Sequence, residues 1–180
     1  MEENLILVKP DISLTGEITA YRQEFLDDGS SMDGCGSLRR HADPRDWLNN
    51  NALLENEATV PEKRVASTQY VFLRASDRRI LGMIQVRHYF NDYLRQFGGH
   101  IGYSIRPSER RMGYAVRMLR DCLPLCRQFG LDKVLITCLD DNEGSRRTIL
   151  ANGGVYESTV YEPDENVHLQ RYWIDLNHRT

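Results

Sequence analysis

The chain has 180 residues, 41% hydrophobic and 27% charged, and a formal net charge of -3. These values fit one globular domain spanning residues 1–180 and exclude a disordered chain. The acidic excess does not favour a nucleic-acid partner, and no apolar run is long enough for a membrane-spanning helix. The acidic start lacks the apolar stretch of a secretory signal. The cysteines form no C-x-x-C pair, so the usual spacing of a zinc or redox site is absent. We therefore expect a cytoplasmic protein with no metal and no membrane partner.

In chain order, apolar periodicity predicts a strand, two helices, a hairpin, a strand, a helix, a strand, a helix and two final strands. The elements are expected at residues 5–8, 14–25, 44–52, 68–75, 80–90, 100–106, 111–129, 134–139, 142–152, 155–161 and 167–176. The Gly-, Ser- and Asp-rich segment 29–41 is expected to be a mobile loop. This order is typical of a mixed α/β layer fold with helices on both faces of a sheet.

Local signals place several helix ends. Asp43 followed by Pro44 is a typical helix start, because Asp caps free N–H groups and Pro fits the first turn. Asn142 is expected to cap a later helix in the same way. Pro124 lies inside the helix predicted at 111–129, so we expect a kink or the loss of one hydrogen bond there.

The segment Arg110–Ala115 lies between a predicted strand and a predicted helix. Backbone N–H groups at a helix start lack partners and lie at the positive end of the helix dipole, so such a turn can bind a phosphate without lysine. Gly113 removes a side chain where phosphates would approach the backbone. Neither the GxxxxGK[ST] loop nor the G-x-G-x-x-G fingerprint occurs, which argues against a simple nucleoside triphosphate or a Rossmann-bound dinucleotide.

The pattern R-x-x-G-x-A at Arg110–Ala115, after a strand ending in Ile-Gly-Tyr-Ser-Ile-Arg-Pro, resembles the acyl-CoA signature of the GNAT (GCN5-related) N-acetyltransferase superfamily. The stretch Asn142–Gly154 resembles the region of the same superfamily in which an Asn opens a helix after the fifth strand, and the element order also matches. The resemblance implies an α/β fold with a central mixed, mostly antiparallel sheet of about seven strands. It also implies helices on both faces and a splay between the fourth and fifth strands.

The resemblance further implies acetyl-CoA as co-substrate and a set of residues that binds it. The pantetheine arm would meet main-chain groups of the fourth strand and the Asn142 side chain, and the pyrophosphate would meet the N–H groups of 110–116. The implied cofactor-binding residues are Tyr103, Ser104, Ile105, Arg110, Arg111, Met112, Gly113, Tyr114, Ala115, Val116 and Asn142. For the glycine and the small residues, an ordinary structural turn is the alternative.

Two positions depart from the family's pattern. Many members place a tyrosine, the acid for the leaving thiolate, where this chain has Ile149, and another common arrangement places a glutamate base where it has Thr137. His100 shares a strand face with Gly102 and Ser104, where some relatives carry a glutamate, so it is the candidate catalytic base. The alternative is a structural histidine hydrogen-bonded at the end of a loop.

The sequence thus predicts an N-acetyltransferase that moves an acetyl group from acetyl-CoA to a primary amine of a small molecule or peptide, by direct attack in a ternary complex. The two departures favour an alternative, a catalytically silent acyl-CoA-binding sensor or regulatory module. The segment 29–41, with Asp33, could cover the acceptor and bind its cation, or only connect two helices. A homodimer paired through strands is a further option, and the acceptor amine stays open.

Overall fold

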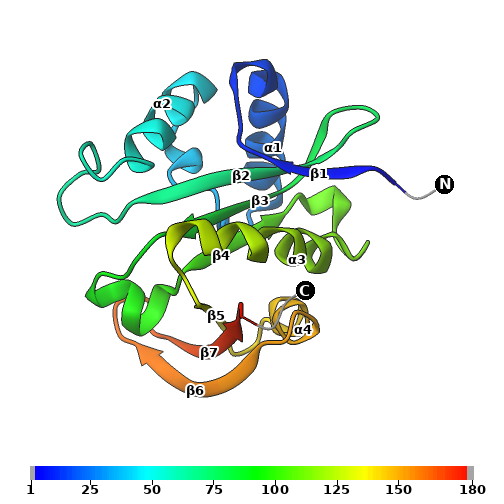
Figure 1. Ribbon diagram of the computed structural model, residues 1–180. Coiled ribbons are helices and arrows are strands. Elements are labelled where there is room, and N and C mark those ends of the chain that lie inside the picture. Colours follow the sequence, from blue (N-terminus) through cyan, green and yellow to red (C-terminus); the bar gives the residue numbers. More distant parts are fainter. Residues whose placement is uncertain (1–2, 178–180) are drawn as a thin grey trace.

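The computed structural model describes residues 3–177 (Figure 1). The strands and α-helices are β1 (Leu5–Val8), α1 (Thr15–Asp28), α2 (Pro44–Leu54), β2 (Ser67–Arg74), β3 (Arg79–Arg87), β4 (Ile101–Ile105), α3 (Tyr114–Cys126), β5 (Lys133–Leu139), α4 (Glu143–Ala151), β6 (Val155–Glu162) and β7 (Val167–Asp175). Short helical turns lie at η1 (Ile12–Leu14), η2 (Leu38–Arg40), η3 (Leu94–Gly98), η4 (Pro107–Glu109) and η5 (Arg127–Phe129). Within residues 3–177, no helix is both long and apolar enough to cross a membrane.

The strands form two sheets that separate between β4 and β5. The first sheet has the order β1-β2-β3-β4 and the second the order β5-β7-β6, and every hydrogen-bonded pair is antiparallel. The upper and lower halves of the ribbon correspond to these two sheets (Figure 1). The prediction of about seven strands with a splay between the fourth and the fifth is therefore confirmed.

Helices cover both faces of the first sheet, as predicted, and create two apolar cores. Because side chains alternate along a strand, Val71 and Leu73 of β2 pack with α1 and α2, whereas Tyr70 and Phe72 pack with α3. The first core is centred on Tyr21, Phe25 and Trp47, which are fully buried. The second core continues from the first sheet through α3 into β5, β7 and α4, so it joins the two sheets.

The helix ends follow the local signals in the sequence. The Asp43 side chain accepts a hydrogen bond from the Arg45 N–H at 2.9 Å, and Asn142 Oδ1 accepts one from the Ser145 N–H at 3.1 Å. Both predicted caps are therefore confirmed. Helix α3 continues through Pro124 to Cys126 and then tightens into the 3-10 turn η5, so the proline lies within the last turn of the regular helix.

Two expectations about local structure are wrong. Helix α3 begins at Tyr114 rather than at residue 111, because Arg111 and Gly113 adopt left-handed backbone angles, with φ of 65° and 80°. Segment 29–41 is packed rather than a mobile loop: it contains η2, its Cys35 is fully buried, and the Cys35 carbonyl accepts a hydrogen bond from Trp47 Nε1 at 2.8 Å. Packed apolar side chains thus outweigh the loop-like composition of this segment.

Candidate active site

The two sheets touch where β4 begins and diverge beyond that point. The His100 N–H donates to the Leu135 carbonyl at 2.8 Å, and the Leu135 N–H donates back to His100 Nδ1 at 2.9 Å. Gly99 fits this close approach because a Cβ there would lie 2.6 Å from the Leu135 oxygen, and its φ is 66°. Within the described chain, no hydrogen-bond ladder joins β4 to β5 beyond this contact.

Residues Tyr103, Ser104 and Ile105 lie on β4 at the splay, as the resemblance implies. They pair with β3 along one edge, and along the other edge β4 has no strand partner among residues 3–177. The Ser104 carbonyl accepts a hydrogen bond from the Tyr21 hydroxyl at 3.1 Å, and the Ile105 carbonyl accepts one from Arg110 Nε at 3.3 Å. Because no strand pairs with this edge of β4 in the described chain, an extended ligand could add there as a further strand.

The Tyr103 side chain crosses from β4 to α4. Its hydroxyl lies 2.8 Å from Ser145 Oγ, and it also donates to the Ser145 carbonyl at 3.3 Å. Burial raises the pKa of the Tyr103 hydroxyl well above its usual value, so the group stays protonated over the physiological range. A hydroxyl donor is thus present beside the helix that carries Ile149.

The turn before α3 presents a row of free backbone donors. No N–H group of residues 111–116 donates to another group of the described chain. The left-handed residues Arg111 and Gly113 alter the direction of successive N–H groups, as in the concave nests that bind anions. A non-glycine residue held at positive φ is strained, and such strain is typical of ligand-binding sites. The last members of the row also lie at the positive end of the α3 dipole.

The Arg110 side chain does not enter this turn. Its guanidinium contacts Asp28 at 3.3 Å and the Ser30 hydroxyl at 2.8 Å, and it lies 5.5 Å from the centre of the Phe25 ring. Arg110 thereby ties the end of α1 to the turn. The donors that this turn leaves free are therefore main-chain N–H groups rather than the Arg110 guanidinium.

The positions that depart from the family's pattern have structural roles. Ile149 is fully buried in the core that joins the two sheets, and Thr137 Oγ1 donates to the Phe97 carbonyl at 2.7 Å. Neither can act as an acid or a base. Asn142 is exposed at the start of α4, and its Oδ1 is used as the helix cap. The Asn142 Nδ2 group has no partner within residues 3–177 and can still donate to a ligand.

His100 is buried and neutral. Its ring stacks on Phe90 with centroids 3.9 Å apart, and Trp173 meets it edge-on at 6.3 Å. Burial, with a smaller contribution from the Arg87 charge, lowers the pKa of His100 to about 4. Since Nδ1 accepts the Leu135 N–H, the neutral ring carries its proton on Nε2.

A polar cluster missed by sequence reasoning lies under segment 29–41. The hydroxyl of Tyr21 and the thiol of Cys35 lie 3.1 and 3.4 Å from Ser104 Oγ. Gly34 lies directly on β4, where a Cβ would come within 2.2 Å of the Gly102 oxygen. Burial raises the pKa of the Cys35 thiol to about 12, so it is not a nucleophile. Segment 29–41 therefore forms one wall beside β4.

A cavity of about 900 Å³ opens between this wall, the ends of β2 and β3, and the β3–β4 connection. Gln85 and Arg87 of β3 line it. Sequence reasoning missed both, although two polar residues at alternate positions of an apolar strand are a usable signal. In the described part of the chain, no group of His, Cys, Asp or Glu side chains is arranged to hold a metal ion.

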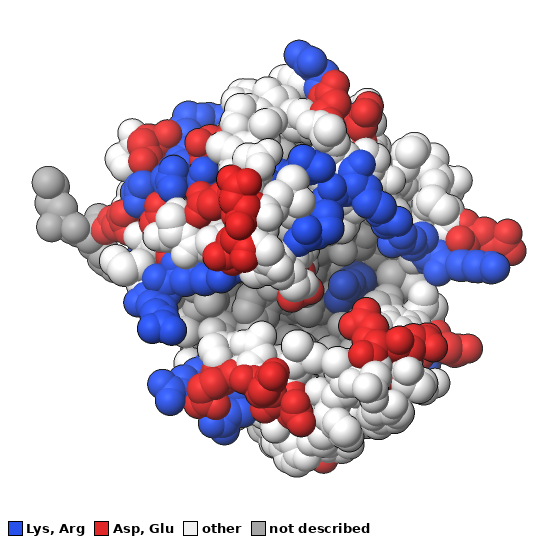
Figure 2. Space-filling view, turned by 180° about the vertical axis from the view of Figure 1, so that it is seen from behind, with Lys and Arg blue, Asp and Glu red and all other residues white. Residues whose placement is uncertain are grey.

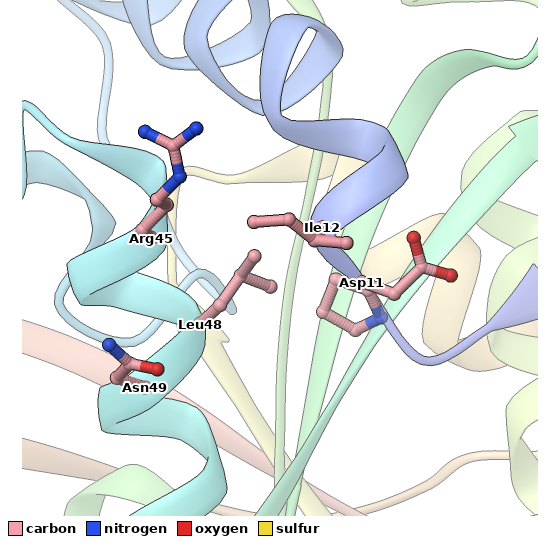
Figure 3. Close-up of a pocket in the computed structure, with 6 residues that line it drawn as sticks. Asp11, Ile12, Arg45, Leu48 and Asn49 are labelled. Atoms are coloured by element: carbon pink, nitrogen blue, oxygen red, sulfur yellow. The ribbon is translucent and has the colours of Figure 1, made fainter.

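A second hollow, of about 290 Å³, lies apart from these residues. It is formed where the chain enters α1 and α2, and Ile12 and Leu48 face each other across it (Figure 3). Asp11, Arg45 and Asn49 lie around its edge (Figure 3). None of the predicted site residues lines it.

Three solved structures with a similar fold are acetyltransferases. They are the ribosomal-protein-S5-alanine acetyltransferase from Vibrio fischeri, the putative acetyltransferase yncA from Salmonella typhimurium with acetyl-CoA, and a spermidine N-acetyltransferase SpeG chimera from Vibrio cholerae and hSSAT. Their identities are 14%, 13% and 13%, with TM-scores of 0.69, 0.64 and 0.65. The alignments cover 100%, 98% and 96% of this chain and 97%, 96% and 95% of the others. At these identities, the likeness shows the fold.

The family of the chain is assigned from its sequence. No curated protein sequence matches the chain significantly. The family model described as the acetyltransferase (GNAT) domain, however, matches residues 6–155, which include the splay, the turn before α3 and helix α4. The chain therefore belongs to the GNAT acetyltransferase family.

Proposed function

We propose that the protein transfers an acetyl group from acetyl-CoA to a primary amine of a small molecule or peptide, by direct attack while both substrates are bound. The observation that carries this proposal is the row of unpartnered N–H groups at 111–116, next to the open edge of β4. The Salmonella relative holds acetyl-CoA, and the other two relatives are named for an alanine of a ribosomal protein and for spermidine. Acetyl acceptors in similar folds therefore include amines.

The residues present fit acetyl-CoA. The turn offers main-chain donors to a diphosphate, and a Cβ at Gly113 would meet no atom within 4 Å, so the approach is open. The free edge of β4 at Tyr103 to Ile105 and the Nδ2 group of Asn142 offer polar partners to an amide-containing arm. Bound by these groups, the arm would bring its thioester end near the splay.

The reaction requires the neutral amine, whose lone pair attacks the thioester carbonyl carbon as the carbon–sulfur bond breaks. A main-chain N–H group at the open edge of β4, near Ile105, would stabilise the charge that develops on the carbonyl oxygen. We assign the proton donor for the departing thiolate to Tyr103, because its hydroxyl lies against α4, one turn from Ile149. This assignment supplies the acid that position 149 lacks.

The role of His100 in proton transfer stays a prediction. Its neutral form is available at physiological pH, but its Nδ1 lone pair is engaged by the Leu135 N–H. To accept a proton from the amine, His100 would have to release the Leu135 N–H, either to free Nδ1 or to carry its own proton on Nδ1 and expose the lone pair of Nε2. The same hydrogen bonds show what the side chain does structurally, which is to hold β4 against β5 at the base of the splay.

Two assays together test the proposal. A thermal shift with CoA and with acetyl-CoA reports binding, since a ligand at 100 times its Kd stabilises the fold by about 2.7 kcal/mol. Release of free thiol is then followed across polyamines, amino acids and peptide N-termini. Binding together with amine-dependent thiol release supports the transferase. Binding without release from any amine would point instead to the silent sensor or regulatory module.

The oligomeric state is a separate prediction. Strand β6 is at the edge of the second sheet, and it exposes Val155, Tyr156 and Tyr161. A strand-mediated homodimer is compatible with this edge. Light scattering coupled to size exclusion measures the mass directly.

A further inference from the structure

Basic side chains gather in the cavity beside β4. Four of its lining residues are basic (Arg40, Lys63, Arg64 and Arg87), and one, Asp33, is acidic. Blue side chains also gather at the upper rim and inside a hollow between the two halves of the molecule (Figure 2). Clefts lined by charges of one sign raise the local concentration of oppositely charged ligands.

The four basic side chains have no carboxylate partner. In the described part of the chain, none of them forms an ion pair. Elsewhere in the molecule arginines are commonly paired, and Arg106, for example, contacts two glutamates at 2.8 and 2.7 Å. The positive charge of the cavity is therefore not neutralised by the protein itself.

Arg87 is held with one edge of its guanidinium free. Its Nη1 donates to the carbonyls of Gly98 and Gly99 at 3.1 and 3.4 Å, whereas Nε and Nη2 have no acceptor among residues 3–177. Burial lowers the pKa of Arg87 below its usual value, which reflects a desolvated cation without a close counter-ion. The free Nε and Nη2 atoms form the fork that binds a carboxylate through two parallel hydrogen bonds.

A second buried polar group lies beside Arg87. Gln85 is two residues earlier on β3, so it points to the same face, and it is only 7% exposed. Its carboxamide makes no hydrogen bond to another residue of the described chain. The amide lines the cavity, so it can form a hydrogen bond with a ligand bound beside Arg87.

This free edge is next to the strand at which acetyl transfer is proposed. Arg87 Nη2 would lie 3.3 Å from a Cβ placed on Gly102, the residue before Tyr103. Asp33 lines the same cavity, and its negative charge acts to raise the pKa of both Arg87 and Tyr103. A carboxylate bound at Arg87 would thus hold an amine attached to the adjacent carbon close to β4, with Asp33 available to its ammonium form.

We propose that the acceptor is a free α-amino acid, whose carboxylate binds to the Nε and Nη2 edge of Arg87 while its amino group faces β4. This inference rests on the proposed function and adds the chemical class of the acceptor. A polyamine is disfavoured, since its several positive charges would meet Arg40, Lys63, Arg64 and Arg87.

The test compares each of the twenty L-amino acids with its carboxamide, and adds spermidine and peptides with a neutral or an acidic second residue. Isothermal titration of the CoA-loaded protein measures binding without turnover, and thiol release with acetyl-CoA measures activity. We expect at least one amino acid to bind at least 10-fold more tightly than its carboxamide, with the same order in kcat/KM. Equal binding of acid and amide, or preference for spermidine or a peptide, overturns the inference.

Variants separate a specific site from a general loss of structure. Arg87→Gln should abolish the preference for acid over amide, and a normal thermal shift with CoA would show that the variant folds. Arg64→Gln, at the exposed rim with no side-chain bond to lose, should raise KM for the amino acid about 3-fold, and less so at high salt. Acid preference unchanged in both variants would overturn the inference. If amines of other classes are acetylated without a preference for the acid, the proposed function stands and only this inference fails. If no amine is acetylated, the titration of the CoA-loaded protein still shows whether an amino acid binds more tightly than its carboxamide.

Discussion

The Nδ1 atom of His100 accepts a hydrogen bond from the Leu135 N–H at 2.9 Å, and the His100 N–H donates to the Leu135 carbonyl at 2.8 Å. His100, the residue before β4, is thereby joined to Leu135 of β5 by two hydrogen bonds. Beyond this point β4 continues with β3 and β5 with β7. The base of the splay is therefore fixed by a neutral imidazole.

This relationship makes stability depend on pH. The pKa of His100 is about 4 in the folded state against an ordinary 6.5, so the folded state binds fewer protons than the unfolded state. The stabilisation is complete above pH 6.5 and is lost as pH falls toward 4, by up to about 3 kcal/mol. In urea unfolding, the difference in free energy of unfolding between the wild type and His100→Gln should become smaller as pH falls from 6.5 toward 4. A gap that is constant from pH 7.5 to 4.5 would contradict the lowered pKa.

The strained turn before α3 gives a second prediction. Arg111→Gly relieves a positive φ, so it should change stability by less than about 1 kcal/mol and change CoA affinity less than 3-fold. Gly113→Val forces a β-branched residue to the same kind of angle, which should cost about 1 to 2 kcal/mol and weaken CoA binding at least 10-fold. Denaturation and calorimetric titration measure both. The two variants form a matched pair. A larger loss of CoA affinity from Arg111→Gly than from Gly113→Val would show that the Arg111 side chain, rather than the main chain of the turn, binds CoA.

Sequence reasoning predicted the secondary-structure elements because these depend on local signals. Apolar periodicity set the strands and helices, and Asp43 and Asn142 set helix starts through their own hydrogen bonds. It missed Tyr21 and Arg87 because their roles arise from contacts distant in the chain. Tyr21 meets Ser104, 83 residues later, and Arg87 is placed by carbonyls of a connection without periodicity.

Tyr103 gives a third prediction, about the departing thiolate. Tyr103→Phe removes the hydroxyl that lies against α4 and keeps the ring, so it should lower kcat about 10- to 100-fold while the Kd of acetyl-CoA changes less than 3-fold. Tyr156→Phe on β6 is the control and should keep full activity, because within residues 3–177 its hydroxyl forms a hydrogen bond with Thr159 alone. Unchanged kcat in Tyr103→Phe would leave the acid unassigned.

The ion pairs of Arg106 give a fourth prediction, about stability alone. The Arg106 side chain is 4% exposed and joins Glu17 and Glu24 of α1 to the end of β4. Arg106→Ala leaves both carboxylates without their partner and should lower the free energy of unfolding by about 2 to 3 kcal/mol. Arg120→Ala, at a side chain that is 62% exposed, should change it by less than about 0.5 kcal/mol. Equal effects of the two substitutions in urea would show that burial of Arg106 contributes nothing.

The most direct measurement follows the amide signals of the labelled protein by two-dimensional NMR during titration with CoA. The largest shifts should fall on the N–H groups of residues 111–116, because these donors gain an acceptor only when the diphosphate is bound. Saturable CoA binding that leaves these amides unmoved would contradict the account.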